Sequence, residues 1–424
     1  MKNILKFIVV LVLSLLSRAV VRRYRPHIVM VTGSVGKTST KDAVAAVLAT
    51  RFFVRKSEKS FNSEFGVPFT ILGVDNPWNN PLAWFSLVKR AVALLILPNH
   101  YPKMLVLEVG ADRPGDLARI LRIVTPDAVV VTKLPEVPVH VEAYASPEAV
   151  REEEFSPAYA LRAAAPLIVS SDDVYALESA RRTPARIISY GLAEKAAVQV
   201  REIDFSESNG RVDGMRAGVS MNGKRGTIVV KGSVGSTQIF PAAAALAAAL
   251  AFDIALPDAL KALEGYEPPP GRGRLLAGKN GSIVIDDSYN SSPVAVEQAL
   301  ETLKVFPCAT RRIAVLGDML ELGRYSVVEH ERVGRLARSA ADLVIAVGIR
   351  ARAFAMAEGK AEVMLFDNSR AAADALVGIA GPGDIILVKG SQSVRTERIV
   401  KSLLADPADE SLLVRQERKW HDRA

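Results

Sequence analysis

Hydrophobic residues in the first half of the chain occur as short β-branched runs at residues 27–32, 104–109, 128–132 and 167–170. The segments between these runs are long enough for crossover helices, so the pattern predicts an α/β fold with a mainly parallel sheet. Residues 196–231 instead alternate between apolar and polar positions, and Asn222-Gly223 is a typical hairpin turn. This part of the chain predicts a small antiparallel edge.

A Pro- and Gly-rich stretch at residues 267–274 follows an Ala-rich segment, 241–251, that predicts a helix. The stretch can continue neither a helix nor a strand, which makes it a domain boundary. Beyond it, a second series of apolar runs predicts a doubly wound, Rossmann-like α/β domain; the runs are residues 283–286, 313–317, 343–347, 363–366 and 384–388. We therefore expect an N-terminal segment at 1–26, a central domain at 27–267 and a C-terminal domain at 268–424.

The N-terminal segment carries an apolar stretch at residues 4–21 that is interrupted by Lys6 and Arg18 and followed by an arginine cluster, 22–25. Its uninterrupted core, residues 7–16, is shorter than the roughly 20 residues of a spanning helix, and no small-residue cleavage site follows it. A cleaved signal peptide is therefore not expected. The alternatives are a short membrane anchor or an amphipathic helix lying on the membrane or on the protein itself, and we favour membrane association.

The composition is that of a folded chain. Of 424 residues, 49% are hydrophobic, 24% charged and 6% aromatic, which excludes a disordered protein. The one cysteine, Cys308, excludes an internal disulfide framework and a multi-cysteine zinc site, and fits a reducing compartment. The net charge of +8 suits an anionic membrane face or anionic substrates equally well. We expect no nucleic-acid partner.

A phosphate-binding loop follows the first apolar run and opens a helix at residues 38–48. Its glycines let consecutive amides face an anion, the helix N-terminus adds its positive end, and the lysine and threonine can reach phosphate oxygens and Mg²⁺. Val31 stands where the longer form of the motif has glycine, so the match is to GxxGK[ST]. The loop predicts ATP binding by Gly33, Ser34, Val35, Gly36, Lys37, Thr38 and Ser39.

Glu108 closes the apolar run at 104–109. A carboxylate at the carboxyl end of a parallel strand, in the same sheet as a phosphate loop, is where a Mg²⁺ ligand would lie. The alternative is an ordinary solvated residue at a strand end. The loop at 33–39 favours the metal ligand.

The chain resembles the Mur ligase family, ATP-dependent amide-bond-forming enzymes of bacterial cell-wall synthesis, over residues 28–404. Within the family it is most similar to the branch that adds D-alanyl-D-alanine to a UDP-muramoyl tripeptide. Besides the loop, the resemblance rests on SFNSEFGVP at 60–68, LEVGADRPGDL at 107–117, VHVE at 139–142, IDDSYNSSP at 285–293, AVLGDMLELG at 314–323 and LVKGS at 387–391.

The resemblance implies that the γ-phosphate of ATP is transferred to a carboxylate and that an amine then attacks the acyl phosphate. Lys37 and the loop amides would neutralise the moving phosphoryl group, and Thr38 and Glu108 would hold Mg²⁺. His140 matches the family histidine near a second metal, and Asn62 a substrate- or phosphate-side asparagine. Residues that match those binding the nucleotide from the second domain are Arg274, Asp287, Tyr289 and Asn290. Residues that match those facing the incoming amine are Asp318, Glu321, His330, Lys389 and Ser391.

The chain departs from the family at Glu154, which stands where a lysine usually becomes carbamylated and binds the second Mg²⁺. One interpretation is that the glutamate replaces the carbamate as a metal ligand. The other is that residues 152–154 form a solvated acidic helix start and the second metal is lost. A further departure is Gly235-Ser-Thr-Gln238, which lacks the family's histidine and asparagine and leaves the adenine contacts open.

The loop also begins at Gly33, which leaves no room for the N-terminal domain of about a hundred residues with which related enzymes bind the UDP end of the substrate. Either another protein or the membrane presents the acceptor, or the acceptor is not a UDP-sugar peptide. The apolar segment in that place favours a lipid-linked or membrane-proximal acceptor.

The sequence therefore predicts an ATP- and Mg²⁺-dependent carboxylate-amine ligase that joins an amino acid or a D-alanyl-D-alanine-like dipeptide to a cell-wall precursor. The alternatives are a poly-γ-glutamate-type synthetase, a lipid-precursor-modifying ligase working with a partner amidase, and a non-catalytic nucleotide-binding scaffold of the cell envelope. We expect the protein in the cytoplasm, either free or anchored to the inner face of the cytoplasmic membrane.

Overall fold

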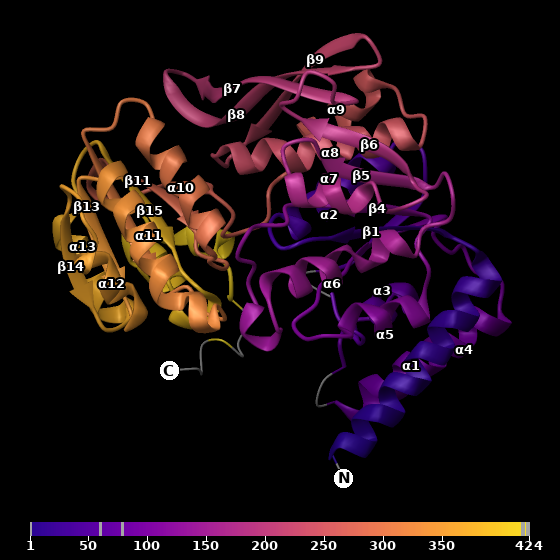
Figure 1. Ribbon diagram of the computed structural model, residues 1–424. Coiled ribbons are helices and arrows are strands. Elements are labelled where there is room, and N and C mark those ends of the chain that lie inside the picture. The colour runs from indigo at the N-terminus through magenta and orange to yellow at the C-terminus, as the bar shows by residue number, and fades with distance from the viewer. Residues whose placement is uncertain (1, 59–61, 78–79, 417–419, 421–424) are drawn as a thin grey trace.

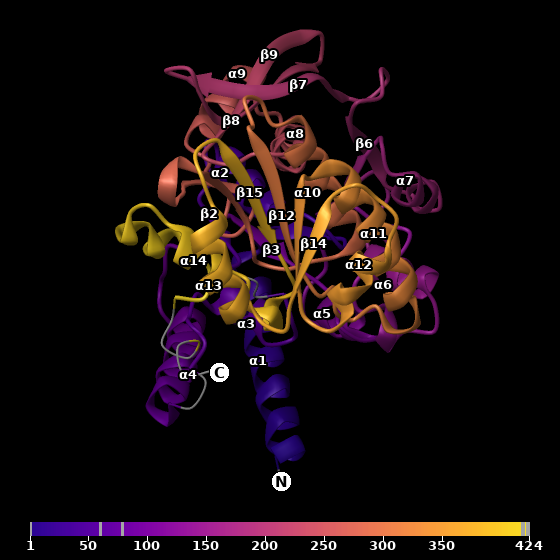
Figure 2. The same ribbon diagram turned by 90° about the vertical axis from the view of Figure 1, so that its left-hand side faces the viewer.

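The computed structural model describes residues 2–58, 62–77, 80–416 and 420. Within these residues the strands form two separate sheets that lie beside each other, as Figure 1 and Figure 2 show. One sheet belongs to the expected central region and the other to the expected C-terminal region. The α/β fold class is confirmed.

The first sheet has nine strands in the described part of the chain, in the order β2-β3-β1-β4-β5-β6-β7-β8-β9. Neighbours from β2 to β7 pair in parallel, and β7, β8 and β9 pair antiparallel, as the alternating pattern of residues 196–231 predicts. The strands are β1 (His27–Thr32), β2 (Val54–Lys56), β3 (Met104–Glu108), β4 (Ala128–Val131), β5 (Pro166–Ser170), β6 (Arg186–Gly191), β7 (Val198–Ser208), β8 (Arg211–Met221) and β9 (Lys224–Lys231).

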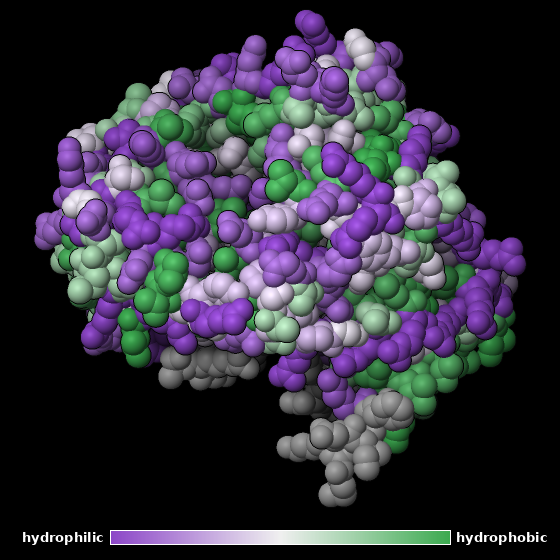
Figure 3. Space-filling model, viewed as in Figure 1, coloured by the Kyte–Doolittle hydropathy of each residue, from purple (hydrophilic) through white to green (hydrophobic). Residues whose placement is uncertain are grey.

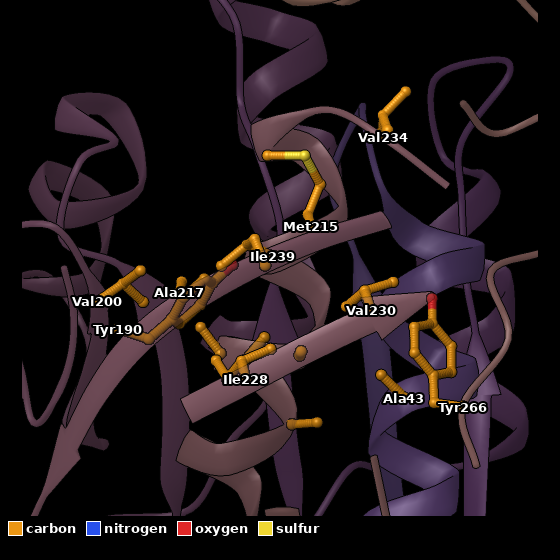
Figure 4. Close-up of a cluster of buried hydrophobic side chains, with 14 of the residues drawn as sticks. Ala43, Tyr190, Val200, Met215, Ala217, Ile228, Val230, Val234, Ile239 and Tyr266 are labelled. Atoms are coloured by element: carbon orange, nitrogen blue, oxygen red, sulfur yellow. The ribbon is translucent and has the colours of Figure 1, made fainter. Parts of the chain in front are cut away.

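Both faces of this sheet are buried. Along β1, Val29 and Val31 pack into one hydrophobic core, while Ile28 and Met30 pack into another on the opposite face. The first core contains the Ala-rich helix α8 (Ser236–Ala251), whose small side chains let it lie close to the strands. Figure 4 shows part of this core, where side chains of β6 to β9 meet α2, α8 and Tyr266.

Helices connect the strands and cover the two faces. Those of the central region, besides α8, are α2 (Lys37–Leu48), α3 (Gly66–Leu72), α4 (Pro81–Ile96), α5 (Asp116–Ile123), α6 (Pro147–Tyr159), α7 (Val174–Ala180) and α9 (Leu256–Glu264). Those of the C-terminal region are α10 (Pro293–Val305), α11 (Ser326–Ala340), α12 (Ala353–Met356), α13 (Ser369–Ile379) and α14 (Glu397–Leu403).

The second sheet has six strands among the described residues, in the order β10-β11-β15-β12-β13-β14. All neighbours pair in parallel except β10 and β11. The strands are β10 (Arg274–Ala277), β11 (Ile283–Asp287), β12 (Arg311–Gly317), β13 (Leu343–Val347), β14 (Glu362–Phe366) and β15 (Asp384–Lys389). The carboxyl ends of β11 and β15 deliver Asp287 and Lys389 to one point, since the two residues are register partners.

The N-terminal segment forms one helix, α1 (Lys2–Tyr24), which contacts α3, α4 and α5. Leu13 and Val20 are buried in these contacts, and Tyr24 stacks on Tyr101 with 4.5 Å between ring centroids. No helix within the described ranges has both the length and the apolar character needed to cross a bilayer. The contacts of α1 with α3, α4 and α5 dock the helix on the protein, which is one of the arrangements that the sequence left open.

Candidate functional site

The phosphate loop joins the carboxyl end of β1 to α2. Gly33 has φ 113° and Gly36 has φ 87°, so both lie in the region that favours glycine. A Cβ on Gly33 would also collide with the Thr132 hydroxyl, since the loop runs against β4. The Lys37 ammonium folds back to donate to the Gly33 carbonyl and, at 3.4 Å, to that of Ser34. The loop thus holds a cation among backbone groups at a helix N-terminus, as an anion-binding site requires.

Glu108 lies directly beside this loop because β3 pairs with β1 and puts Glu108 opposite Val31. The Thr38 hydroxyl donates to Glu108 Oε1 at 3.1 Å. The other oxygen, Oε2, is buried and has no hydrogen-bond partner among the described residues. Burial raises the pKa of Glu108, and the charges of Lys41 and Lys37 oppose this. A hydroxyl next to a carboxylate with an uncompensated buried oxygen fits a divalent cation such as Mg²⁺.

A cleft of about 510 Å³ opens above the loop, between the two sheets. It brings together many of the residues predicted from the sequence, from both sides of the 267–274 boundary. Its walls also contain Asp112, Arg272 and Trp420, which the sequence did not single out. The predicted residues that line it are Ser34, Val35, Gly36, Lys37, Thr38, Asn62, Glu108, His140, Tyr289, Asn290, Glu321 and Ser391.

A smaller cavity of about 50 Å³ lies on the other side of the loop. Gly36 and Ser39 line it from the central region, and Asp287 and Lys389 line it from the C-terminal region. The buried Lys389 and the partly buried Asp287 form an ion pair with 2.7 Å between Lys389 Nζ and Asp287 Oδ2. Lys389 also donates to the Asn290 carbonyl at 3.0 Å, so the lysine fixes the loop after β11.

Two family models match the chain, the Mur ligase middle domain over residues 31–249 and the Mur ligase glutamate ligase domain over residues 271–392. The first alone spans just over half of the sequence. The chain belongs to the Mur ligase family. The resemblance inferred from the motifs, and with it the assignment as an ATP-dependent amide-bond ligase, is therefore confirmed.

Curated relatives and solved structures agree with this assignment. The UDP-N-acetylmuramoyl-tripeptide--D-alanyl-D-alanine ligase of Bacillus subtilis (strain 168) is 29% identical over 399 residues, covering 92% of this chain and 79% of that protein. The enzyme of the same name from Mycobacterium tuberculosis (strain ATCC 25618 / H37Rv) is 29% identical over 405 residues, with 89% and 73% covered.

The fold is similar to that of MurF ligase from Thermotoga maritima in complex with ADP, with a TM-score of 0.77 at 24% identity and 95% and 84% of the two chains covered. MurF from Acinetobacter baumannii gives a TM-score of 0.76 at 23% identity, with 92% and 79% covered. These two structures support the fold.

His140 of this Mur ligase precedes a short 3₁₀ turn, Val141–Ala143, and points into the cleft. Its Nδ1 lies 3.0 Å from Glu321 Oε2 and its Nε2 lies 3.5 Å from Asp112 Oδ1. Burial by itself lowers the pKa of His140, but the hydrogen bond and charge of Glu321 outweigh it and raise the pKa above its usual range. The imidazole therefore favours the charged form beside two carboxylates.

Glu154 lies behind the phosphate loop rather than in the cleft. It is 1% exposed, its Oε2 accepts a hydrogen bond from the Ser34 hydroxyl, and its backbone carbonyl accepts from Thr32 Oγ1 at 2.6 Å. Burial raises the pKa of Glu154, and the charge of Lys37 opposes this most strongly. The carboxylate is not part of a solvated acidic helix start, because it is enclosed against the loop.

The residues predicted as metal ligands, Thr38, Glu108, His140 and Glu154, do not meet at one point. Within the described ranges, no group of three or more His, Cys, Asp or Glu side chains could hold a metal ion. Thr38 and Glu108 are in contact, whereas His140 contacts Glu321 and Glu154 contacts Ser34.

Three other predicted residues point away from the cleft. Arg274 begins β10 and donates to the Pro268 carbonyl at 3.4 Å, while Arg272 lines both cavities. Asp318 accepts from the Ala351 amide at 2.8 Å. His330 accepts from the Met319 amide at 3.0 Å through Nε2 and donates to the Ser326 carbonyl at 2.7 Å through Nδ1, and burial lowers its pKa. Asp318 and His330 thus hold the loops after β12 and β13.

Arg272 is the main functional candidate that the sequence missed. Its guanidinium lies over the ring of Tyr289, 4.2 Å from the ring centroid, and it faces both the phosphate loop and β11. Two arginines alternate with glycines at 271–274, so either could face the nucleotide. The sequence holds no signal that chooses between them, because the choice depends on the antiparallel pairing of Arg274 with Asp286, which fixes Arg274 in the sheet.

Proposed function

We propose that this Mur ligase joins D-alanyl-D-alanine to the terminal carboxyl group of a UDP-muramoyl tripeptide, with ATP and Mg²⁺, through an acyl phosphate. The observation that carries the proposal is the meeting of the phosphate loop, Glu108 and His140 with Asn290, Glu321 and Ser391 in one cleft. The names of the Bacillus subtilis and Mycobacterium tuberculosis relatives support this pair of substrates.

The phosphate loop orients ATP in this proposal. The amides of residues 33–39 and the Lys37 ammonium bind the β- and γ-phosphates, and Arg272 approaches from the C-terminal region. The acceptor carboxylate then attacks the γ-phosphorus, the bond to the β,γ-bridging oxygen breaks and ADP leaves. Lys37 stabilises the negative charge that spreads over the equatorial oxygens.

Thr38 and Glu108 hold Mg²⁺, consistent with the buried, unpartnered Oε2 of Glu108. When bound, the ion neutralises charge on the phosphate oxygens. Glu154 supplies negative charge behind the loop, in the place of the carbamylated lysine of the family. Asp287, Tyr289 and Asn290 bind the nucleotide from the C-terminal side.

The second step needs a free amine. The ammonium group of the dipeptide enters near Glu321, Asp112 and Ser391, whose oxygens attract it, and Asn62 lies on the acceptor side. After the ammonium loses one proton to solvent, its nitrogen attacks the acyl carbon. The nitrogen then loses a second proton to solvent, the C–O bond to phosphate breaks and inorganic phosphate leaves. The reaction takes place in the cytoplasm, where ATP is available.

Phosphate release by the full-length protein tests the proposal. With UDP-muramoyl tripeptide and D-alanyl-D-alanine together, we expect phosphate and a ligated product of matching mass in equal amounts, and almost no phosphate with either substrate alone. Release that requires glutamate instead of the dipeptide would support a poly-γ-glutamate-type synthetase. Tight ADP binding with no release for any acceptor and amine would support the non-catalytic scaffold.

A further inference from the structure

The outer surfaces of α1 and α4 form one apolar face on the protein. In α1 its members follow helical spacing of i, i+3, i+4 and i+7, so they lie along one side of the helix. The most exposed members on α4 are Leu82 at 80% and Phe85 at 71%. We call this surface the α1–α4 face; it consists of Ile8, Leu11, Val12, Leu15, Leu82, Phe85, Val88, Val92, Ile96 and Leu97.

The two helices are held firmly by their other sides. Leu13 of α1 and Leu87, Ala91 and Leu94 of α4 are buried in the core that also contains β1 and β3. The Arg18 guanidinium of α1 donates to the Arg122 carbonyl at the end of α5. The α1–α4 face is therefore a regular outer surface of a folded helix pair.

The figures show where this surface lies on the molecule. In Figure 1 and Figure 2, α1 and α4 extend beyond the rest of the central region. Figure 3 shows hydrophobic residues gathered over the lower right of the molecule, where Figure 1 has these two helices. Scattered apolar residues on a surface need no explanation, but a contiguous group on two adjacent helices indicates a binding surface.

The charged residues of the two helices have one sign. Neither α1 nor α4 contains an aspartate or glutamate. Among the residues of the two helices whose exposure the structure describes, the exposed basic ones are Lys6, Arg22 and Arg23 on α1 and Lys89 and Arg90 on α4, and the exposed Arg25 follows α1 directly. Lys6 pairs with Glu64 of the neighbouring segment at 3.2 Å. Apolar residues beside an excess of cations are typical of helices that lie in the headgroup region of an anionic bilayer.

We propose that the α1–α4 face binds the surface of a membrane that contains anionic lipids, with the helices lying in the interface and the basic residues contacting lipid phosphates. Neither helix spans the bilayer in this arrangement. A second copy of the chain is a poorer partner, because a two-fold interface would bring the same basic residues of both copies together. The proposal goes beyond the ligase reaction and does not depend on the substrate assigned to it.

Sedimentation of the full-length protein with vesicles tests the proposal. We expect it to bind vesicles of phosphatidylglycerol and phosphatidylethanolamine, to bind phosphatidylcholine vesicles much more weakly, and to dissociate as salt is added. The double variant Phe85→Asp/Ile96→Asp should reduce the bound fraction at least about tenfold. Matched controls are Val174→Asp and Met356→Asp, which replace residues that are 70% and 84% exposed elsewhere on the molecule and should bind like the parent.

A milder variant, Phe85→Ser/Ile96→Ser, should also lose vesicle binding, and it keeps the test valid if the aspartate variant misfolds. Thermal melting shows whether each of the two variants is folded. Equal vesicle binding by the parent and the serine variant would overturn the proposal, as would failure of the parent to bind anionic vesicles. Sedimentation velocity without lipid tests whether a second copy of the chain covers the face instead. If the parent is a dimer, the serine variant is a monomer and neither binds vesicles, the face would be assigned to a second copy. None of these measurements requires turnover, so they are independent of the proposed reaction.

Discussion

His140 of the central region and Glu321 of the C-terminal region face each other across the cleft, with 3.0 Å between Nδ1 and Oε2. The two loops that carry them are in close contact, because the Glu142 amide donates to the Glu321 carbonyl at 3.5 Å and a Cβ on Gly323 would lie 2.9 Å from Glu142 Cβ. Both residues also have positive φ, 66° and 64°. The pair thus links the two sides of the ligase at the point where acceptor and amine would meet.

Replacing Glu321 with glutamine should lower the pKa of His140, since the hydrogen bond and charge of Glu321 are what raise it against burial. The same contact lowers the pKa of Glu321. The histidine's contribution to stability is full below its ordinary pKa, about 6.5, and is lost as the pH rises through its raised pKa. The glutamate's contribution is present above its ordinary pKa and is lost as the pH falls through its lowered one.

The measurement is an NMR titration of the histidines, with His140 assigned by its absence in a His140→Asn variant. The chain has five histidines, and His330 serves as an internal control because it lies in the C-terminal region and contacts Met319 and Ser326 instead of Glu321. An unchanged pKa of His140 in the Glu321→Gln variant would show that the contact does not persist in solution.

Replacing Lys37 with methionine should lower the rate of phosphate release to about 1% of the parent rate or less. One positively charged donor to the transferred phosphoryl group contributes a factor of about 10² or more to the rate. Methionine keeps the length of the side chain without its charge. Lys231→Met is the matched control, since Lys231 is an exposed lysine at the end of β9. Rates are compared at saturating ATP, and parent-like activity of the Lys37→Met variant would contradict the assignment of the loop.

Arg272→Ala should raise the KM for ATP about tenfold, the size expected when one charge-assisted hydrogen bond to phosphate is lost. Arg274→Ala should change it much less, because Arg274 pairs within the sheet and approaches Glu267 at 3.9 Å. Thermal melting of both variants separates binding from stability. If Arg274→Ala has the larger effect on KM with an unchanged melting temperature, the assignment from the sequence is the better one.

The sequence predicted the buried strands well, because each is a continuous apolar run bounded by residues that end a strand. The expected and observed bounds of β1 and β13 coincide, and those of the other expected strands differ by one or two residues. It missed β2, which has only three residues, two of them basic, and β6, whose exposed Arg186 and Ile187 interrupt the pattern. It also missed β10, a strand of four residues that begins at the end of the Pro- and Gly-rich stretch. Such short or mixed strands are recognised only through their neighbours in the sheet.

In the cleft, too, features contained in one stretch of sequence could be predicted, and features that depend on contacts between distant residues could not. The phosphate loop and Glu108 could be found because their chemistry is contained in a few consecutive residues next to a strand. Asp112 and Trp420 could not, because only the folded chain brings them to His140 and Tyr289. The docking of α1 also depends on partners far along the sequence, such as Tyr101 for Tyr24.

Glu154 offers the sharpest test of how this ligase differs from its family. If the glutamate supplies the charge of a metal ligand, Glu154→Gln and Glu154→Ala should both shift the Mg²⁺ dependence of phosphate release to higher concentration, because both lack that charge. If it only positions the loop through Ser34, glutamine should restore the parent's Mg²⁺ profile, since its amide oxygen can still accept the hydrogen bond.

Glu152→Gln is the control on the same helix, because Glu152 forms an exposed ion pair with Arg182 at 2.8 Å. Its Mg²⁺ profile should match that of the parent. A parent-like profile for Glu154→Ala would remove both roles. A shifted profile for alanine alone would identify Glu154 as a positioning residue for the phosphate loop, and a shift for both variants would make it the functional replacement of the carbamylated lysine. The glutamine variant therefore decides between charge and hydrogen bonding, which the alanine variant alone cannot separate.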